Sequence, residues 1–286
     1  LLSNSDDLRL LALCDRCDGP VEQSLGLYDS QTRGLPSWVP DWADRRPYGP
    51  ISRHISDGML NVSGPAVPYT VSRGLLCRPS DEDVFHDEKG TIRRYALTAD
   101  PTELKVKGVV LGLIRSLGPL YDSNVRGHVD IILNSVTFIK VSGFETINLS
   151  QLPSDQHAME QFLEDHMQAQ LDSMLRCLTC DRKSDGSSFD TPISFARNGH
   201  DPEVVFSIQA STYGRRLCRM TTGHILLVPR HVEVSDAVAV ILGCPLPVIL
   251  RKVEPPNGPW NNPLDGNYVL VGVACMSFLP VHFAPC

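Results

Sequence analysis

The chain has 286 residues, 42% of them hydrophobic and 21% charged, which is typical of a globular protein with one large domain or two smaller ones. No run approaches the roughly 18 apolar residues that a membrane helix needs, so we expect no membrane contact. The net charge of −7 argues against the broad basic surface that nucleic-acid binding requires, so neither DNA nor RNA is an expected partner.

The first segment is predicted to form a short helix, because leucines recur after the acidic, cap-forming stretch Ser5–Asp7, and Gly19 and Pro20 would end it. The chain starts at Leu1, and its first residues lack the basic region and cleavage site of a signal peptide. Nine cysteines, several of them within apolar runs, suit reduced thiols. We therefore expect a piece of a longer protein that resides in the cytoplasm.

The stretch "LPSWVPDWA" at residues 35–43 brings Trp38 and Trp42 together in a segment too rich in proline for a helix or a central strand. A buried tryptophan removes roughly 150–250 Å² from water, so the pair can anchor an irregular segment. Pro40 holds the backbone between them. Asp41 is either a functional carboxylate or a cap for the backbone N–H groups of its own loop.

The middle of the chain is predicted to be mostly strand and to close with a long helix. Runs rich in Val, Ile and Leu at 59–62, 104–114 and 129–141 have β character. Apolar residues then recur every three or four positions in a window without Gly or Pro, which predicts an amphipathic helix over about 154–180.

The last third is predicted to form a small antiparallel unit after a connection at 183–213. Short β runs separated by Gly, Pro and Asn fit a β-barrel-like unit over 214–280, which would leave few exposed strand edges. The expected fold class is α+β: an N-terminal helix, a β-rich block ending at residue 182, and this C-terminal unit. All of it could also be one compact domain.

Few residues suggest chemistry. Cys14 and Cys17, together with Cys177 and Cys180, have the spacing of zinc ligands and would make a zinc-stabilised scaffold if the fold joined the two pairs. The standard phosphate-loop, dinucleotide, metalloprotease and serine-nucleophile motifs are absent from the sequence. We therefore expect no cofactor and no catalytic residue.

Two further sets of residues leave alternatives open. Arg215 and Arg216 are expected to pair with an acid of a partner, or with Asp41, or to begin a strand in solvent. An enzyme of unrecognised type would need polar residues to converge in space, for which the candidates are His224, Asp236 and Cys218.

Several stretches resemble the fungal heterokaryon-incompatibility (HET) proteins. "LPSWVPDWA" is similar to the family's Leu-Pro-Ser-Trp-x-Pro-Asp-Trp segment that follows the HET domain. Three stretches in the expected order are similar to its later strands, and a fourth to the closing strand: "ELKVKGVVLGLI" (103–114), "GRRLCRMTTGHILLVP" (214–229), "SDAVAVILGCPLPVILRKV" (235–253) and "YVLVGVACM" (268–276). Ser235 stands where the family usually has glycine before the aspartate.

The resemblance implies the region downstream of a HET domain, whose own sequence blocks are missing from this chain. It implies a non-catalytic regulatory or interaction role in fungal vegetative incompatibility and programmed cell death. The expected partners are the protein's own upstream HET domain and a non-self trigger protein. Any nucleotide chemistry would belong to that upstream domain, and the anchor or interaction residues would be Trp38, Pro40, Asp41, Trp42, Arg215 and Arg216.

Overall fold

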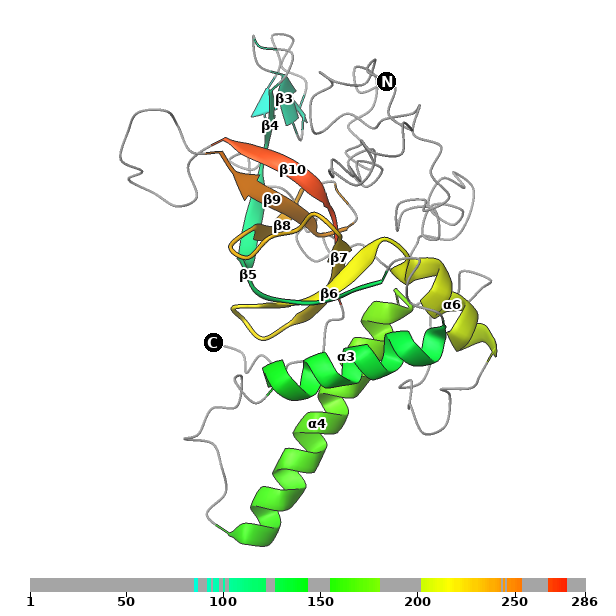
Figure 1. Ribbon diagram of the computed structural model, residues 1–286. Coiled ribbons are helices and arrows are strands. Elements are labelled where there is room, and N and C mark those ends of the chain that lie inside the picture. Colours follow the sequence, from blue (N-terminus) through cyan, green and yellow to red (C-terminus); the bar gives the residue numbers. More distant parts are fainter. Residues whose placement is uncertain are drawn as a thin grey trace. The chain divides into compact units, whose positions relative to one another are not determined.

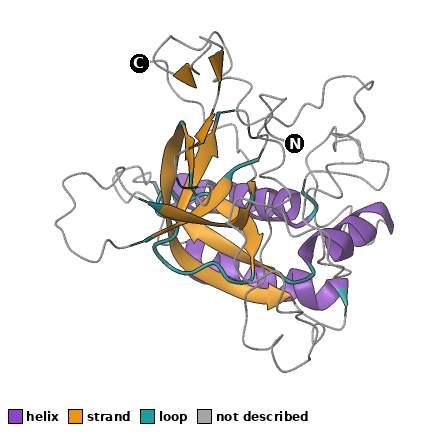
Figure 2. Ribbon diagram, turned by 90° about the horizontal axis from the view of Figure 1, so that it is seen from above, coloured by secondary structure: helices purple, strands orange, loops and turns teal. Residues whose placement is uncertain are grey.

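A computed structural model of the chain describes part of the sequence, namely residues 85–86, 92–93, 95–97, 100, 103–121, 127–143, 155–180, 202–242, 244, 246–253 and 267–276. Several predictions lie outside these residues: the N-terminal helix, the tryptophan segment with Trp38, Pro40, Asp41 and Trp42, the strand at 59–62, and Cys14 and Cys17. The described residues combine helices with antiparallel strands, which confirms the α+β class (Figure 2).

The chain divides into two compact units, each discontinuous in sequence. The first unit comprises Leu1–Leu113 and Pro229–Ala274, and the second comprises Ile114–Val228 and Cys275–Cys286. The predicted boundaries near residues 182 and 214 stay predictions.

The first unit contains a four-stranded antiparallel ladder in the order β10-β9-β8-β5. Its strands are β5 (Gly108–Tyr121, of which Gly108–Leu113 lies in this unit), β8 (Ala237–Ile241), β9 (Val248–Lys252) and β10 (Tyr268–Val273). Two small antiparallel pairs precede it, namely β1 (Phe85–His86) with β2 (Ile92–Arg93), and β3 (Tyr95–Leu97) with β4 (Leu104–Val106). Strand β8 is buried along its whole length, as its unbroken apolar sequence predicts.

The second unit combines strands with three helices. Its ladder has the order β5-β6-β7-β11, formed by Ile114–Tyr121 of β5, β6 (Arg215–Met220), β7 (Ile225–Pro229) and β11 (Cys275–Met276). Strands β6 and β7 form a hairpin, and Gly223 in its turn has a φ of 87°, a conformation that favours glycine. The helices are α3 (His128–Gly143), α4 (Gln156–Leu178) and α6 (Pro202–Thr212).

The predicted strands of the last third are confirmed, and two of them, β6 and β8, pair with a strand from the middle of the chain. Strand β5 from the middle block pairs with β6 through Ile114–Tyr121 and with β8 through Gly108–Leu113. Register shifts at three places along β5 let one long strand serve two neighbours. Periodicity cannot reveal such a pairing, because it depends on contacts about a hundred residues apart in sequence.

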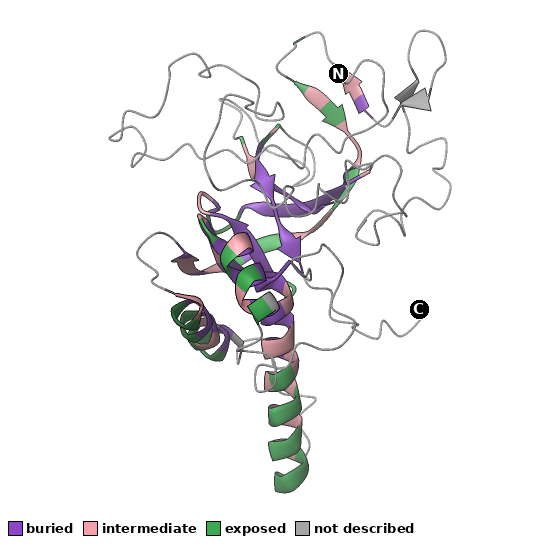
Figure 3. Ribbon diagram, turned by 90° about the vertical axis from the view of Figure 1, so that its right-hand side faces the viewer, coloured by how far each residue is buried: buried purple, intermediate pink, exposed green. Residues whose placement is uncertain are grey.

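Helix α4 confirms the long helix predicted over about 154–180. It begins at the N-cap Asp155, whose carboxylate accepts a hydrogen bond of 2.8 Å from the Ala158 backbone N–H. The helix ends before Cys180, which has a positive φ of 51°. Its last turns are buried, whereas much of its first half is exposed (Figure 3).

The run 129–141, predicted to be a strand, is in fact part of helix α3. Its buried residues recur at helical spacing, and they are Ile131, Ile132, Ser135, Ile139 and Ser142. Gly118 of β5 lets the helix approach closely, since a Cβ there would lie 3.0 Å from the Phe138 ring. The contacts of α3 with β5, and with α4, which it crosses (Figure 1), therefore outweigh the β-strand preference of residues 129–141.

Helix α6 (Pro202–Thr212) lies in the segment 183–213 that was predicted to be a connection. Pro202 stands at its first position, where a missing backbone N–H costs nothing. Val204 and Ile208 are fully buried and attach the helix to the second unit. No helix among the described residues is both long enough and apolar enough to span a membrane.

Candidate functional site

The connection between β7 and β8 contains a tight turn at residues 230–236. The Asp236 backbone N–H donates to the Glu233 carbonyl at 3.2 Å, which closes a four-residue turn around Val234 and Ser235. Ser235 has a φ of 77°, a left-handed conformation that costs a non-glycine residue roughly 1–2 kcal/mol. The turn therefore needs support from outside itself.

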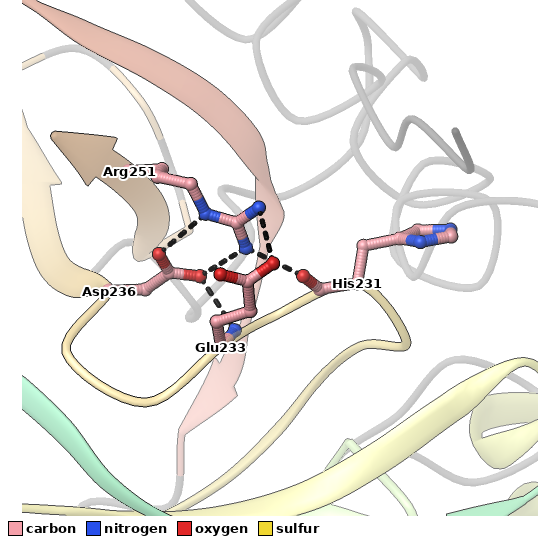
Figure 4. A network of polar contacts seen from close by, with 4 residues as sticks. All are labelled: His231, Glu233, Asp236 and Arg251. Atoms are coloured by element: carbon pink, nitrogen blue, oxygen red, sulfur yellow. Dashed lines mark hydrogen bonds and ion pairs between the residues drawn. The ribbon is translucent and has the colours of Figure 1, made fainter. Parts of the chain in front are cut away.

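Arg251 of β9 supplies that support (Figure 4). Its Nε donates to Asp236 Oδ1 at 2.9 Å, and its Nη2 donates to Asp236 Oδ2 at 2.9 Å. Nη2 also donates to the His231 carbonyl at 2.7 Å, and Nη1 lies 2.9 Å from Glu233 Oε1. The His231 ring itself points away (Figure 4). We call Arg251, Asp236, Glu233 and the His231 carbonyl the Arg251 clamp.

The Arg251 clamp combines a buried carboxylate with a partly exposed guanidinium. The side chain of Asp236 is 4% exposed and that of Arg251 is 35% exposed. Asp236 Oδ2 also accepts from the Glu233 backbone N–H at 2.8 Å, so the carboxylate bonds the turn as well as the strand. The hydrogen bonds between Arg251 and Asp236, followed by the negative charges of Asp236 and Glu233, raise the pKa of Arg251 above its usual value.

Strand register explains why these residues meet. Ala237 of β8 pairs with Leu250 of β9, so Asp236 and Arg251 stand at the next opposed positions of the hairpin. The stretch "SDAVAVILGCPLPVILRKV" contains both residues. From the sequence, Asp236 was expected only as a candidate catalytic residue, and Arg251 and Glu233 were not expected in a site. An alignment of the two strands about the intervening loop would have paired Asp236 with Arg251.

The Arg251 clamp is better suited to present a fixed turn to another protein than to transfer a proton. Arg251 engages both carboxylates of the clamp, and this holds the backbone of the turn in one conformation. The turn then exposes Val234 by 54% and the Glu233 side chain by 67%. A fixed aliphatic side chain beside a carboxylate can contact another protein without losing much conformational entropy on binding.

Of the predicted interaction residues, the two arginines lie in the sheet of the second unit. Arg215 is 4% exposed, and Arg216 is half-buried. Arg216 donates from Nε and Nη2 to the Gly118 carbonyl at 3.2 and 2.9 Å, and burial lowers its pKa. Arg216 therefore supports the pairing of β6 with β5, and neither arginine begins a strand in solvent.

Two of the predicted zinc ligands, Cys177 and Cys180, lie buried at the end of α4. Cys177 Sγ donates to the Ile225 carbonyl at 3.1 Å. A hydrogen bond with Cys180, together with burial, raises the pKa of Cys275, and burial raises the pKa of Cys218. The five cysteines of the described segments form no disulfide bond, and no group of three metal-binding side chains within those segments could hold an ion.

The three residues considered for an unrecognised enzyme do not meet within either unit. Asp236 belongs to the first unit and is engaged by Arg251. His224 and Cys218 belong to the second, where His224 Nδ1 is hydrogen-bonded to the Thr222 hydroxyl at 3.0 Å and Cys218 is buried. Burial lowers the pKa of His224, which favours its neutral form.

No protein-family model matches this chain, and no curated protein or solved structure matches it either.

Proposed function

We propose that this chain is a non-catalytic interaction region of a fungal HET-type protein that acts in vegetative incompatibility and programmed cell death. The observation that carries the proposal is the agreement between the resemblance and the strands. The four stretches downstream of residue 100 that resemble the family overlap with β4 and with the strands of both ladders, from β5 to β11.

The Arg251 clamp gives this proposal a site. Its two central residues, Asp236 and Arg251, are the Asp and Arg of the longest stretch that resembles the family. We propose that they hold the 230–236 turn as the surface that contacts the upstream HET domain. In this proposal the protein is cytoplasmic, a non-self trigger protein releases the contact, and nucleic acid and membranes are not partners.

Two finer expectations belong to the same proposal. The strands within residues 214–280 would form a small antiparallel β-barrel-like unit. Trp38 and Trp42 would anchor the segment between the HET domain and this unit, with Pro40 and Asp41 shaping its backbone and Arg215 and Arg216 supporting the sheet.

The test is a binding titration between this chain and the HET domain that precedes it in the complete protein. Val234→Ser should weaken binding about tenfold, because it removes an exposed apolar contact from the turn. Val109→Ser is the matched control, since Val109 is 49% exposed in the same unit but lies on β5. Arg251→Gln should also weaken binding, because it frees the turn without removing the exposed Val234.

A Trp38→Ala, Trp42→Ala double variant separates anchoring from recognition. Loss of binding in a still-folded double variant would make the tryptophan segment part of the contact. A wild-type chain that does not bind the HET domain, or a complete protein in which no HET domain precedes this chain, would refute the proposal.

A further inference from the structure

Helix α3 presents an apolar stripe to solvent. Val129, Leu133 and Val141 are exposed by 50%, 57% and 73%, and they stand on one side of the helix at intervals of four or eight residues. Thr137 occupies the remaining position of the stripe. Its hydroxyl donates to the Leu133 carbonyl at 2.9 Å, so its hydrogen-bonding group is satisfied within the helix.

The opposite side of α3 is the one that packs into the second unit. Ile131, Ile132 and Ile139 are at most 6% exposed. The helix is therefore apolar on both sides, a pattern typical of helices that are covered all round. Aliphatic side chains aligned over the length of an exposed helix mark a surface that another protein covers.

The stripe is symmetric about the middle of the helix. Val129 and Val141 are equally distant in sequence from Ser135, and so are Leu133 and Thr137. Two charged residues are also placed symmetrically about Ser135. Asp130 lies in the first turn and Lys140 in the last turn, and both are exposed. An antiparallel copy of the same helix would thus set valine against valine, leucine against the methyl group of threonine, and a charge of opposite sign at each end.

We propose that the α3 stripe binds α3 of a second copy of this chain in an antiparallel, two-fold symmetric pair. In such a contact the same patch is used on both subunits. Val129 of one copy lies at the level of Val141 of the other, and Asp130 lies at the level of Lys140. The flexible lysine side chain can reach across the helix pair to the carboxylate.

The expected dimer is weak. A helix of 16 residues is about 24 Å long, and one helix pair covers less than the roughly 800 Å² per partner of a standard stable interface. Association should therefore depend on concentration, and each aliphatic or charged contact should contribute a measurable share of it. This inference does not depend on the proposed HET partner, because it concerns the second unit and a different surface.

The experiment is sedimentation equilibrium of the 286-residue chain over micromolar to submillimolar concentrations. The wild type should dimerise reversibly. Leu133→Asp should raise the dissociation constant more than about tenfold, because it buries a carboxylate in the centre of the stripe. Circular dichroism of each variant verifies that α3 remains folded. A wild-type chain that stays monomeric throughout, or a folded Leu133→Asp variant that dimerises like the wild type, would overturn the proposal.

A charge swap tests the antiparallel geometry. Asp130→Lys and Lys140→Asp should each weaken the dimer severalfold, since each sets like charges against each other. The double variant Asp130→Lys, Lys140→Asp should restore the wild-type dissociation constant. Glu164→Lys, an exposed charge reversal on α4, is the matched control and should change nothing. Single reversals without effect, or a double variant no tighter than the singles, would refute the antiparallel pairing.

Discussion

Helices α3 and α4 contact each other in the second unit, yet their exposed sides differ in kind. Along α4, glutamine side chains donate to carboxylates one turn further on: Gln156 to Glu160 at 3.0 Å, Gln161 to Asp165 at 2.9 Å, and Gln168 to Asp172 at 2.8 Å. Along α3, the equivalent side carries the aliphatic stripe of Val129, Leu133 and Val141. The polar pairs of α4 stabilise that helix locally, whereas those three aliphatic side chains are left exposed to water.

Helices α3 and α4 owe their helical structure to different causes. Helix α4 has a capping aspartate, side-chain pairs along its surface and no β-branched run, so its own sequence favours the helix. Helix α3 is rich in Val, Ile and Thr, which favour strands, and its contacts with the sheet and α4 make it helical. Four substitutions test this difference, in order of decreasing expected effect.

Arg219→Ala should have the largest effect, because Arg219 ties both helices to the β6–β7 hairpin. It is fully buried and donates to Ser142 Oγ of α3 at 3.0 Å, to Gln170 Oε1 of α4 at 3.1 Å, and to the Gly223 carbonyl at 3.0 Å. Losing these bonds should lower the free energy of unfolding by about 4 kcal/mol. Urea titration followed by circular dichroism measures it, and a loss below about 1 kcal/mol would contradict this role.

Ile139→Ala should lower the free energy of unfolding by about 3 kcal/mol, because the side chain is fully buried beneath α3 and its removal leaves a cavity. Val141→Ala, two residues further on and 73% exposed, is the matched control and should cost under about 0.5 kcal/mol in dilute, monomeric protein. An equal loss of unfolding free energy in the two variants would mean that α3 does not pack through the side that carries Ile139.

Asp155→Ala should lower the stability of α4 by about 1 kcal/mol, since it removes the acceptor for the Ala158 N–H. The loss should appear as fraying of the exposed first turns and not as global unfolding. Amide hydrogen exchange resolves the two: faster exchange confined to residues 156–162 is the expected result, and unchanged exchange there would contradict the cap.

Gln161→Ala should have the smallest effect, about 0.3 kcal/mol, because it deletes one exposed side-chain pair with Asp165. A peptide of residues 155–180 makes so small a change visible, since circular dichroism reports its helix content directly. The wild-type peptide should be more helical than a peptide of residues 127–143. The reverse order would mean that α4, too, is helical only through its tertiary contacts.

Local pattern predicted those parts of the fold that local interactions decide. The helix at 154–180 and the strands β6 to β10 follow from periodicity and turn residues, and all are present. Helices α3 and α6 did not follow, because β-branched residues dominate the first and a short segment after a Gly- and Ser-rich stretch forms the second. The place of β5 between β6 and β8 also could not follow, since it depends on long-range pairing.

The candidate site was predictable only in part. The resemblance to the HET proteins included Asp236 and Arg251 within one stretch, but not their contact. The contact needs the register of the β8–β9 hairpin, which composition does not encode. The positive φ of Ser235 also has no signal in this sequence, because a serine, unlike a glycine, does not mark a left-handed backbone conformation.

The buried thiols give the chain an internal reporter of opening. Cys244 lies in the first unit, and Cys177, Cys180, Cys218 and Cys275 lie in the second; all are at most 2% exposed. An alkylating reagent reaches a buried thiol only when the surrounding structure opens, so the labelling rate at each cysteine measures the free energy of that opening. Mass spectrometry of the labelled peptides would therefore give separate opening energies for the two units without any engineered probe.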